Sequence, residues 1–253
     1  MLQSMIIDAH VHVGRNESRW QTTWPELEAL GIDTAVLSAD PESFDLSGDR
    51  TLPGDLSRRE GPYGLWYIGG TPFSGILQGV PTLPRDPRDY QGIDWHCYFS
   101  DAYDYGSSAD EETAAEASEY LDSAEAQPAL AVIEELVGAG MPIRLTETLP
   151  ITVGIIERLP QGVFIIPHMG NRNGGVARVL NMFAKTSRVH FDTSSIEPNE
   201  GMVETVGAKR VLFASGAPHG DVARALRVVR AMDVPAAALE DILGENARRI
   251  FAP

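Results

Sequence analysis

Residues 5–14 read Met5-Ile6-Ile7-Asp8-Ala9-His10-Val11-His12-Val13-Gly14, an apolar and β-branched run that predicts a strand. Side chains alternate between the two faces of a strand, so a period of two would place Asp8, His10 and His12 on one face. Two imidazoles would then project side by side near the end of the strand. Such a pair suits a divalent ion, but two hydrogen-bonded histidines near a barrel mouth give the same pattern.

Seven further strand-like runs recur along the chain. They are Thr34–Ser38, Leu65–Gly69, Gly92–Tyr98, Pro142–Thr146, Val163–His168, Val189–Thr193 and Val211–Ser215. Helical periodicity is clearest at Ala129–Gly138, Val176–Lys185, Asp221–Met232 and Ala236–Ile250. Strands that alternate with helices favour a parallel sheet, and eight of them predict an α/β fold, a distorted (β/α)8 TIM barrel. Segments 41–62 and 70–91 are rich in Pro, Gly and Asp, and are predicted to be loops.

Length and composition set limits on the class of protein. A chain of 253 residues with 43% hydrophobic content suits one barrel domain over residues 1–253. A formal charge of −16 argues against nucleic acid and against acidic membranes as partners. The single cysteine, Cys97, excludes an intrachain disulfide, and the start of the chain has neither a basic leader nor a long apolar run. We therefore expect a cytoplasmic protein, and the apolar closing helix suggests a homodimer.

Several segments together resemble the amidohydrolase superfamily in their order and spacing. They are Asp8–His12, Phe164–Gly170, Phe191–Ser194 and Phe213–His219, followed by Leu243–Phe251, which looks like the closing helix of the superfamily. The resemblance is closest to the amidohydrolase-related branch that includes aminocarboxymuconate-semialdehyde decarboxylase. It implies an active site at the carboxyl ends of the strands, with a divalent ion held by the first-strand His pair, a fifth-strand His and an eighth-strand Asp. A sixth-strand His, here His168, would act as acid or base.

The sequence departs from this pattern at two of the expected metal ligands. The fifth-strand His position is Thr146, and the eighth-strand Asp position is Gly216. Glycine supplies no side-chain ligand, and a neutral threonine hydroxyl is a poor replacement for imidazole. The usual mononuclear site is therefore incomplete.

The interpretation we favour from sequence alone is an amidohydrolase-like enzyme that has lost its metal and needs no cofactor. Arg144 would bind a substrate carboxylate or a developing oxyanion, because its planar fork of donors fits both. His168 would transfer the proton, and His10 and His12 would donate hydrogen bonds or form a second relay. The reaction would then be a lyase, isomerase or cyclising reaction. The alternative role for Arg144 is an internal salt bridge with Asp94 or Asp8.

Two other interpretations stay open. Zinc or another divalent metal could bind His10 and His12 together with His96, Asp94 or Glu147, which gives a hydrolase or a non-oxidative decarboxylase with relocated ligands. Alternatively, the chain is a non-catalytic relative that binds a small molecule.

The expected partner is a small-molecule substrate, an aromatic or conjugated acid. The residues predicted to contact it are Asp94, His96, Tyr98, Tyr103, Thr146 and His219. Tyrosines beside a barrel mouth stack on planar substrates and hydrogen-bond their oxygens, so residues 98–108 are predicted to form part of a lid.

Overall fold

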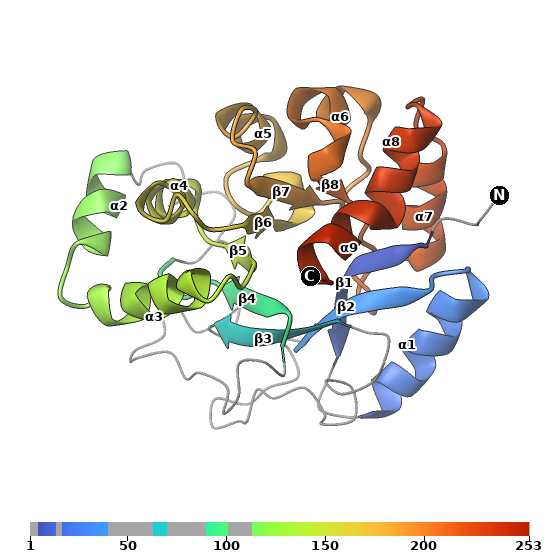
Figure 1. The fold of residues 1–253 in the computed structure, drawn as a ribbon, viewed down its shortest axis with the longest axis horizontal. Helices are drawn as coiled ribbons and strands as arrows, with labels where there is room; N and C mark the ends of the chain where they lie inside the picture. Colours follow the sequence, from blue (N-terminus) through green and yellow to red (C-terminus); the bar gives the residue numbers. More distant parts are fainter. Residues whose placement is uncertain (1–4, 14–16, 40–62, 70–89, 101–112, 253) are drawn as a thin grey trace.

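Eight parallel strands follow one another around a barrel in chain order, β1 to β8 (Figure 1). The computed structural model of the chain describes residues 5–13, 17–39, 63–69, 90–100 and 113–252. The strands are β1 Ile7–Val13, β2 Thr34–Ala39, β3 Tyr63–Gly69, β4 Gly92–His96, β5 Ile143–Thr146, β6 Phe164–Ile166, β7 Val189–Asp192 and β8 Val211–Leu212. The segment after β8 returns to β1, because Ala9 N donates to Phe213 O (2.8 Å) and His12 N donates to Ala217 O (2.7 Å). The predicted (β/α)8 barrel is confirmed.

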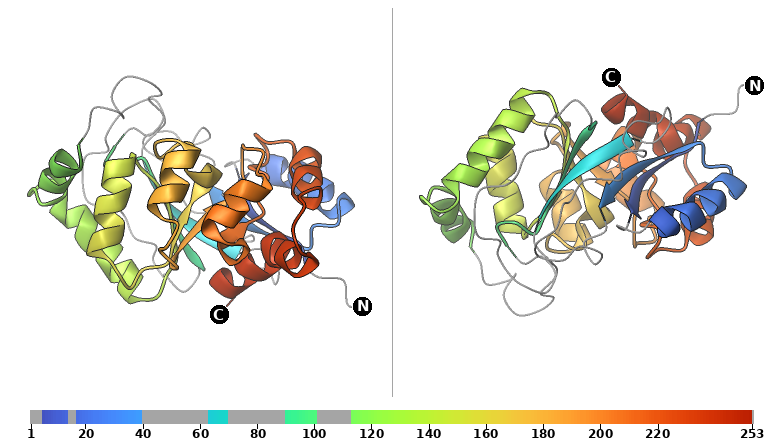
Figure 2. Two further views of the ribbon diagram at one scale, coloured as in Figure 1. Left: turned by 90° about the horizontal axis from the view of Figure 1, so that it is seen from above. Right: turned by 90° about the horizontal axis from the view of Figure 1, so that it is seen from below.

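In the described part of the chain, helices follow β1 and each strand from β4 to β8, and they cover the outside of the barrel. They are α1 Glu17–Ala29, α2 Ala114–Leu121, α3 Gln127–Gly138, α4 Leu149–Arg158, α5 Val176–Met182, α6 Glu200–Val206, α7 Val222–Arg230, α8 Ala236–Glu240 and α9 Asn246–Phe251. Helices α2, α3 and α4 lie at one end of the molecule, and α1, α7 and α8 lie at the other (Figure 2). No helix in these described ranges is long and apolar enough to cross a membrane.

Three of the four predicted helices match α3, α5 and α7 to within a few residues. The fourth, Ala236–Ile250, is divided into α8 and α9 by a π-helical turn at Asp241–Glu245. Local sequence also explains where helices begin. Thr113 and Glu116 form a reciprocal capping box at the start of α2, which satisfies backbone donors that the helix itself leaves unpaired.

Apolar side chains form two separate clusters. The larger cluster fills the layer between the sheet and the surrounding helices. The smaller cluster lies inside the barrel and includes Ile7, Val36 and Leu65, where Ala247 and Phe251 of α9 pack against it. Helix α9 therefore closes one mouth of the barrel (Figure 1), which leaves the polar carboxyl ends of the strands at the other mouth.

Strand β1 does not keep the strict alternation predicted from its sequence. Its register against β2 shifts by one residue between Asp8 and Val11, as in a β-bulge. Ile7 and Ala9 both point into the inner apolar cluster, as regular alternation requires, so Asp8 between them lies on the other face and accepts hydrogen bonds from Ser215 N (2.9 Å) and Ser215 Oγ (2.5 Å). The bulge then places His10 and His12 on the inner face. The prediction that Asp8 shares a face with the two histidines is wrong, because the bulge separates them.

Candidate active site

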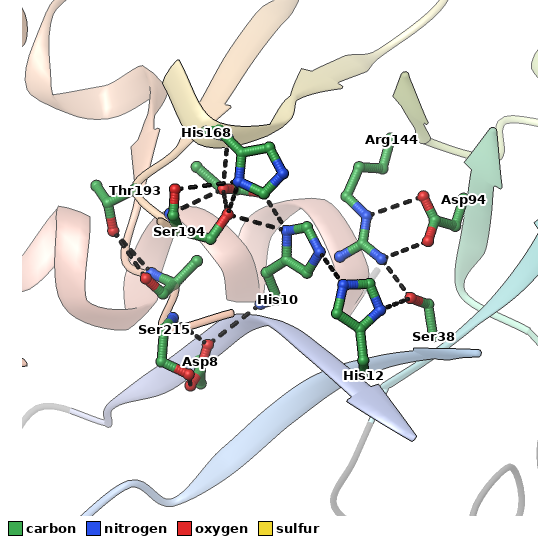
Figure 3. Close-up of polar contacts among 12 residues, drawn as sticks. Asp8, His10, His12, Ser38, Asp94, Arg144, His168, Thr193, Ser194 and Ser215 are labelled. Carbon is green, nitrogen blue, oxygen red and sulfur yellow. Dashed lines mark hydrogen bonds and ion pairs between the residues drawn. The ribbon is translucent and has the colours of Figure 1, made fainter. Parts of the chain in front are cut away.

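Polar side chains from six strands meet inside the barrel at the carboxyl ends of the strands (Figure 3). They are His10 and His12 of β1, Ser38 of β2, Asp94 and His96 of β4, Arg144 and Thr146 of β5, His168 after β6, and Asp192 and Ser194 at the end of β7. All of them except His12 are at least nine-tenths buried. Buried polar groups need partners. The pattern of those partners defines what the site can do.

The His10 and His12 imidazoles face one another through their Nε2 atoms, 3.0 Å apart. On its other side, the His10 ring has Nδ1 2.9 Å from Asp192 Oδ2. The His12 ring has Nδ1 3.4 Å from Ser38 Oγ. Two imidazole nitrogens bound to one divalent ion at about 2.0–2.1 Å lie about 2.9–3.4 Å apart, depending on the ligand angle. The pair therefore fits an ion, although an N–H···N hydrogen bond has a similar length.

His168 lies beside this pair, with its ring centroid 5.3 Å from that of His10. Its backbone has a left-handed conformation, with φ of 55°, and so does that of Met169, with φ of 50°. Such a conformation costs about 1–3 kcal/mol and persists where surrounding contacts impose it. One such contact is the hydrogen bond that His168 N donates to Asp192 Oδ1 (3.0 Å). The left-handed turn at His168 therefore directs its imidazole towards His10.

Arg144 forms an internal salt bridge with Asp94, its neighbour in register on the adjacent strand. The contact is bidentate: Nε donates to Oδ1 at 3.1 Å, and Nη2 donates to Oδ2 at 2.6 Å. Nη2 also donates a hydrogen bond to Ser38 Oγ. The geometry therefore matches the salt-bridge alternative for Arg144. A substrate carboxylate would have to share this guanidinium with Asp94.

Burial and neighbouring charges set the protonation states of the site. Burial alone would raise the pKa of Asp94, but the Arg144 guanidinium holds it well below its usual range. Burial lowers the pKa of His168 to about 4, despite the opposing effect of Asp192, and lowers the pKa of His96 to about 4. The pKa of His12 is also lowered, by burial and then by His10 and Arg144. His12, His96 and His168 are thus neutral near pH 7, as metal ligands and proton acceptors must be.

Glu147 is turned away from the histidines. Its carboxylate accepts hydrogen bonds from Trp95 Nε1 of β4 (2.9 Å) and from the segment that follows β4, through Tyr98 N (2.7 Å), Phe99 N (2.9 Å) and Ser100 N (2.8 Å). Burial raises the pKa of Glu147 to about 7, although these donors oppose the shift. Glu147 and Asp94 are thus both engaged with other partners, which argues against either of them as a relocated metal ligand.

The other predicted substrate contacts have different outcomes. His219 lies at the rim, with its ring 5.8 Å from that of His12. His96 and Thr146 are buried and paired in register at the ends of β4 and β5. Tyr98 packs against Trp95, at 4.8 Å between ring centroids, and belongs to the outer apolar cluster. Tyr103 and most of the predicted lid, residues 101–108, lie outside the described residues, as do most of the predicted loops at 41–62 and 70–91.

The prediction from sequence missed three residues that contact the histidines: Ser38, Asp192 and Ser194. The signal for two of them was available, because the Phe191-Asp192-Thr193-Ser194 run ends a strand at the same barrel mouth as His168. His10, His168 and Asp192 are the group within the described ranges that could hold a metal ion, each offering an atom within 4.8 Å of the others.

Gly216, which follows β8, stands where the resemblance predicts an aspartate ligand. Its φ is 72°, and a Cβ there would lie 3.4 Å from Ser194 Cβ and 3.5 Å from Ser195 Oγ. A cavity of about 250 Å³ is lined by Ser195, Ser215 and Gly220 together with Arg224, Ala225 and Val228 of α7.

Comparisons with known proteins identify the family and agree with the fold. The amidohydrolase family model matches residues 108–252, more than half of the chain. The chain therefore belongs to the amidohydrolase family. A comparison with curated protein sequences finds no match.

Three solved structures illustrate the likeness in fold. Amidohydrolase 2 from Bifidobacterium longum subsp. infantis is 17% identical, with 99% of each chain covered and a TM-score of 0.61. The 5-carboxyvanillate decarboxylase LigW from Sphingomonas paucimobilis is 14% identical, with 99% of each chain covered and a TM-score of 0.62. A dihydroxybenzoic acid decarboxylase from Polaromonas sp. JS666, solved with manganese and 2-nitroresorcinol, is 13% identical, with 99% and 97% covered and a TM-score of 0.58. At these identities the likeness concerns the fold.

His190 of β7 is a partly buried histidine that lies away from the other histidines of the site, and it provides a test of how burial changes a histidine pKa. Burial, together with Arg210 and Arg249, lowers its pKa from 6.5 to about 4. As the pH falls through this window, the unfolded chain binds the proton before the folded chain does. Stability should therefore decrease by about 1.4 kcal/mol per pH unit from this residue alone. In urea unfolding of metal-free protein at pH 7, 6 and 5, His190→Gln should lose stability less steeply than the wild type. Parallel pH profiles for the two proteins would contradict this assignment.

Proposed function

We propose that the protein is a divalent-metal-dependent lyase that removes carbon dioxide from a small, carboxylate-bearing substrate. One observation carries the proposal: the Nε2 atoms of His10 and His12 lie 3.0 Å apart, and Nδ1 of His10 is directed at a carboxylate on its other side. This arrangement is typical of imidazoles that bind a metal. Membership of the amidohydrolase family and the manganese in a decarboxylase of similar fold support it. The proposal reverses the preference drawn from sequence, which favoured loss of the metal.

His10 and His12 would hold the ion, and His168 is the nearest further imidazole. A bound divalent ion would supply positive charge that polarises a substrate oxygen. The chain's own residues would orient the substrate and move its proton. His168 has Nδ1 directed at the Ser194 carbonyl (3.1 Å), so its Nε2 is the atom that would exchange a proton with the substrate. The Arg144–Asp94 pair brings a guanidinium close to the site while adding no net charge.

A metal-independent enzyme is the second candidate, because a continuous series of polar contacts crosses the site. Arg144 donates to Ser38, Ser38 Oγ lies 3.4 Å from His12 Nδ1, His12 contacts His10, and His10 contacts Asp192. If each contact of this series contains one hydrogen, every polar group in the series has a hydrogen-bond partner without a bound ion. In that case His12 would carry its proton on Nε2.

Metal content separates the two candidates. Untagged protein purified without chelator should contain about one manganese or zinc per chain by elemental mass spectrometry. Replacing a metal ligand removes one of few bonds to the ion, so His10→Ala should weaken manganese binding by about 100-fold or more in calorimetric titration. His190→Gln changes a partly buried histidine of β7 outside the proposed metal site, and this variant should bind manganese as the wild type does.

Activity is then measured as carbon dioxide release from a panel of aromatic and conjugated acids, with and without chelator. Release that chelator abolishes and manganese restores is the expected result. Hydrolysis of amides or lactones without release of carbon dioxide would replace the lyase with a hydrolase. Absence of metal, with no stabilisation by manganese or zinc, would overturn the metal-dependent proposal in favour of the second candidate.

A further inference from the structure

Asp192 and Ser194 connect His10 to His168, and the proposed function uses each of them only as the partner of one imidazole. Both are completely buried at the end of β7. Asp192 Oδ1 accepts hydrogen bonds from His168 N (3.0 Å), Ser194 N (3.0 Å) and Ser194 Oγ. Asp192 Oδ2 faces His10 Nδ1 at 2.9 Å. The carboxylate therefore has three donors on one oxygen and one imidazole on the other.

These partners determine which ring nitrogen of each histidine carries the hydrogen. A backbone carbonyl only accepts hydrogen bonds, so His168 Nδ1, 3.1 Å from Ser194 O, must be the donor in that contact. An ionised carboxylate also only accepts, so His10 Nδ1 must donate to Asp192. The one hydroxyl hydrogen of Ser194 is directed at Asp192. Ser194 Oγ is therefore an acceptor towards His168 Nδ1 (2.8 Å) and His10 Nδ1 (3.1 Å).

We propose that Asp192 and Ser194 are positioning residues that hold His10 and His168 as Nδ1–H tautomers, so that both Nε2 atoms carry lone pairs. For His10, that lone pair faces His12, where the ion of the proposed function would bind. The proposal rests on that function for its purpose. The tautomers themselves are a property of the metal-free chain.

The Asp192 carboxylate lies next to a position where the resemblance predicts an aspartate that this chain lacks. In this chain β8 presents Gly216 where the resemblance calls for an aspartate, and a Cβ at that position would contact Ser194. Asp192 supplies a carboxylate from the neighbouring strand, and this carboxylate acts on His10 through a hydrogen bond. A carboxylate that orients a ligand in this way raises the basicity of the imidazole, and its loss commonly weakens metal binding by about 10–100-fold.

The wild-type protein provides the first measurement. A long-range ¹H–¹⁵N spectrum of metal-free protein distinguishes protonated from unprotonated ring nitrogens, and single substitutions assign the 6 histidines. The expected result is that His10 and His168 both have a hydrogen on Nδ1 and none on Nε2. A hydrogen on Nε2 of either ring would overturn the proposal for that ring.

Asp192→Asn is the matched variant, because an amide has almost the same shape as the carboxylate. Its oxygen should face the three donors of the Oδ1 side, which places the NH₂ group against His10 Nδ1. His10 should then move its hydrogen to Nε2, and manganese binding should weaken by about 10–100-fold with the fold retained. An Asp192→Asn protein that keeps the Nδ1–H form of His10 would overturn the proposal.

Asp221→Asn controls for the loss of a charge, because Asp221 caps α7 and asparagine caps a helix equally well. It should leave both tautomers and the manganese affinity unchanged, and a shift in either would overturn the assignment to Asp192. The expected wild-type tautomers together with no metal binding would support the positioning role and disprove the metal-dependent function. The two proposals therefore fail separately.

Discussion

Arg144→Met should lower the free energy of unfolding by about 3–5 kcal/mol, because it leaves the carboxylate of Asp94 buried without its partner. Both side chains are only 2% exposed, and the two hydrogen bonds between them, at 2.6 and 3.1 Å, are lost together. Ser38 also loses the donor from Arg144. Urea unfolding of metal-free protein at pH 7 measures the change.

The double variant Asp94→Leu with Arg144→Met tests whether the buried, unpaired carboxylate of Asp94 causes the loss of stability. Replacing both members of a buried ion pair with apolar groups is often neutral, so the double variant should recover most of the stability that Arg144→Met loses. A double variant that is less stable than either single variant would contradict this explanation. It would indicate that side-chain packing in the barrel interior, rather than the unpaired charge, determines the loss of stability.

Arg210→Met should lower the free energy of unfolding by a similar amount, about 3–5 kcal/mol. Arg210 joins three parts of the chain, and its guanidinium donates to the carbonyls of Phe183, Ala184, Thr186, Val189 and Val206. These carbonyls lie at the end of α5, at the start of β7 and at the end of α6. Methionine has no donor, so several of these acceptors would remain buried without it.

Arg224→Met is the matched control for Arg210→Met. The Arg224 side chain is 59% exposed and forms an ion pair with an equally exposed Glu197. Exposed pairs contribute about 0–1 kcal/mol, so Arg224→Met should be close to the wild type in urea unfolding. Arg210→Lys keeps the charge but not the planar fork, and should lie between the two methionine variants. Equal stability of the Arg210→Met and Arg224→Met proteins would disprove the structural role of Arg210.

Much of the fold was predictable from sequence because its signals are local. Apolar runs of strand length at regular intervals predicted all eight strands, and the polar residues at their ends predicted a shared mouth. Helices α1, α2, α4 and α6 were not singled out. In α4, for example, seven of the ten residues are buried, so the helix lacks the contrast between polar and apolar faces that marks a surface helix.

The candidate site was predictable only in part. His10, His12 and His168 were expected to converge, and they do. The bulge in β1 was not predictable, because the extra residue follows from pairing with β2 and leaves no mark on the local pattern. The role of Asp192 was missed for a similar reason: an acidic residue at a strand end has many uses, and its contact with His10 spans 182 positions in the chain.

The sequence by itself determined the barrel, the mouth at which polar residues gather and the loss of two expected ligands at Thr146 and Gly216. These features follow from residue identity and from the short period of strands and helices. Only the tertiary structure decided the partners: Asp94 for Arg144, the segment after β4 for Glu147, and Asp192 for His10. Barrel closure brings together residues that are far apart in the chain. In a buried site, the nearest oppositely charged or hydrogen-bonding group then determines the state of each side chain.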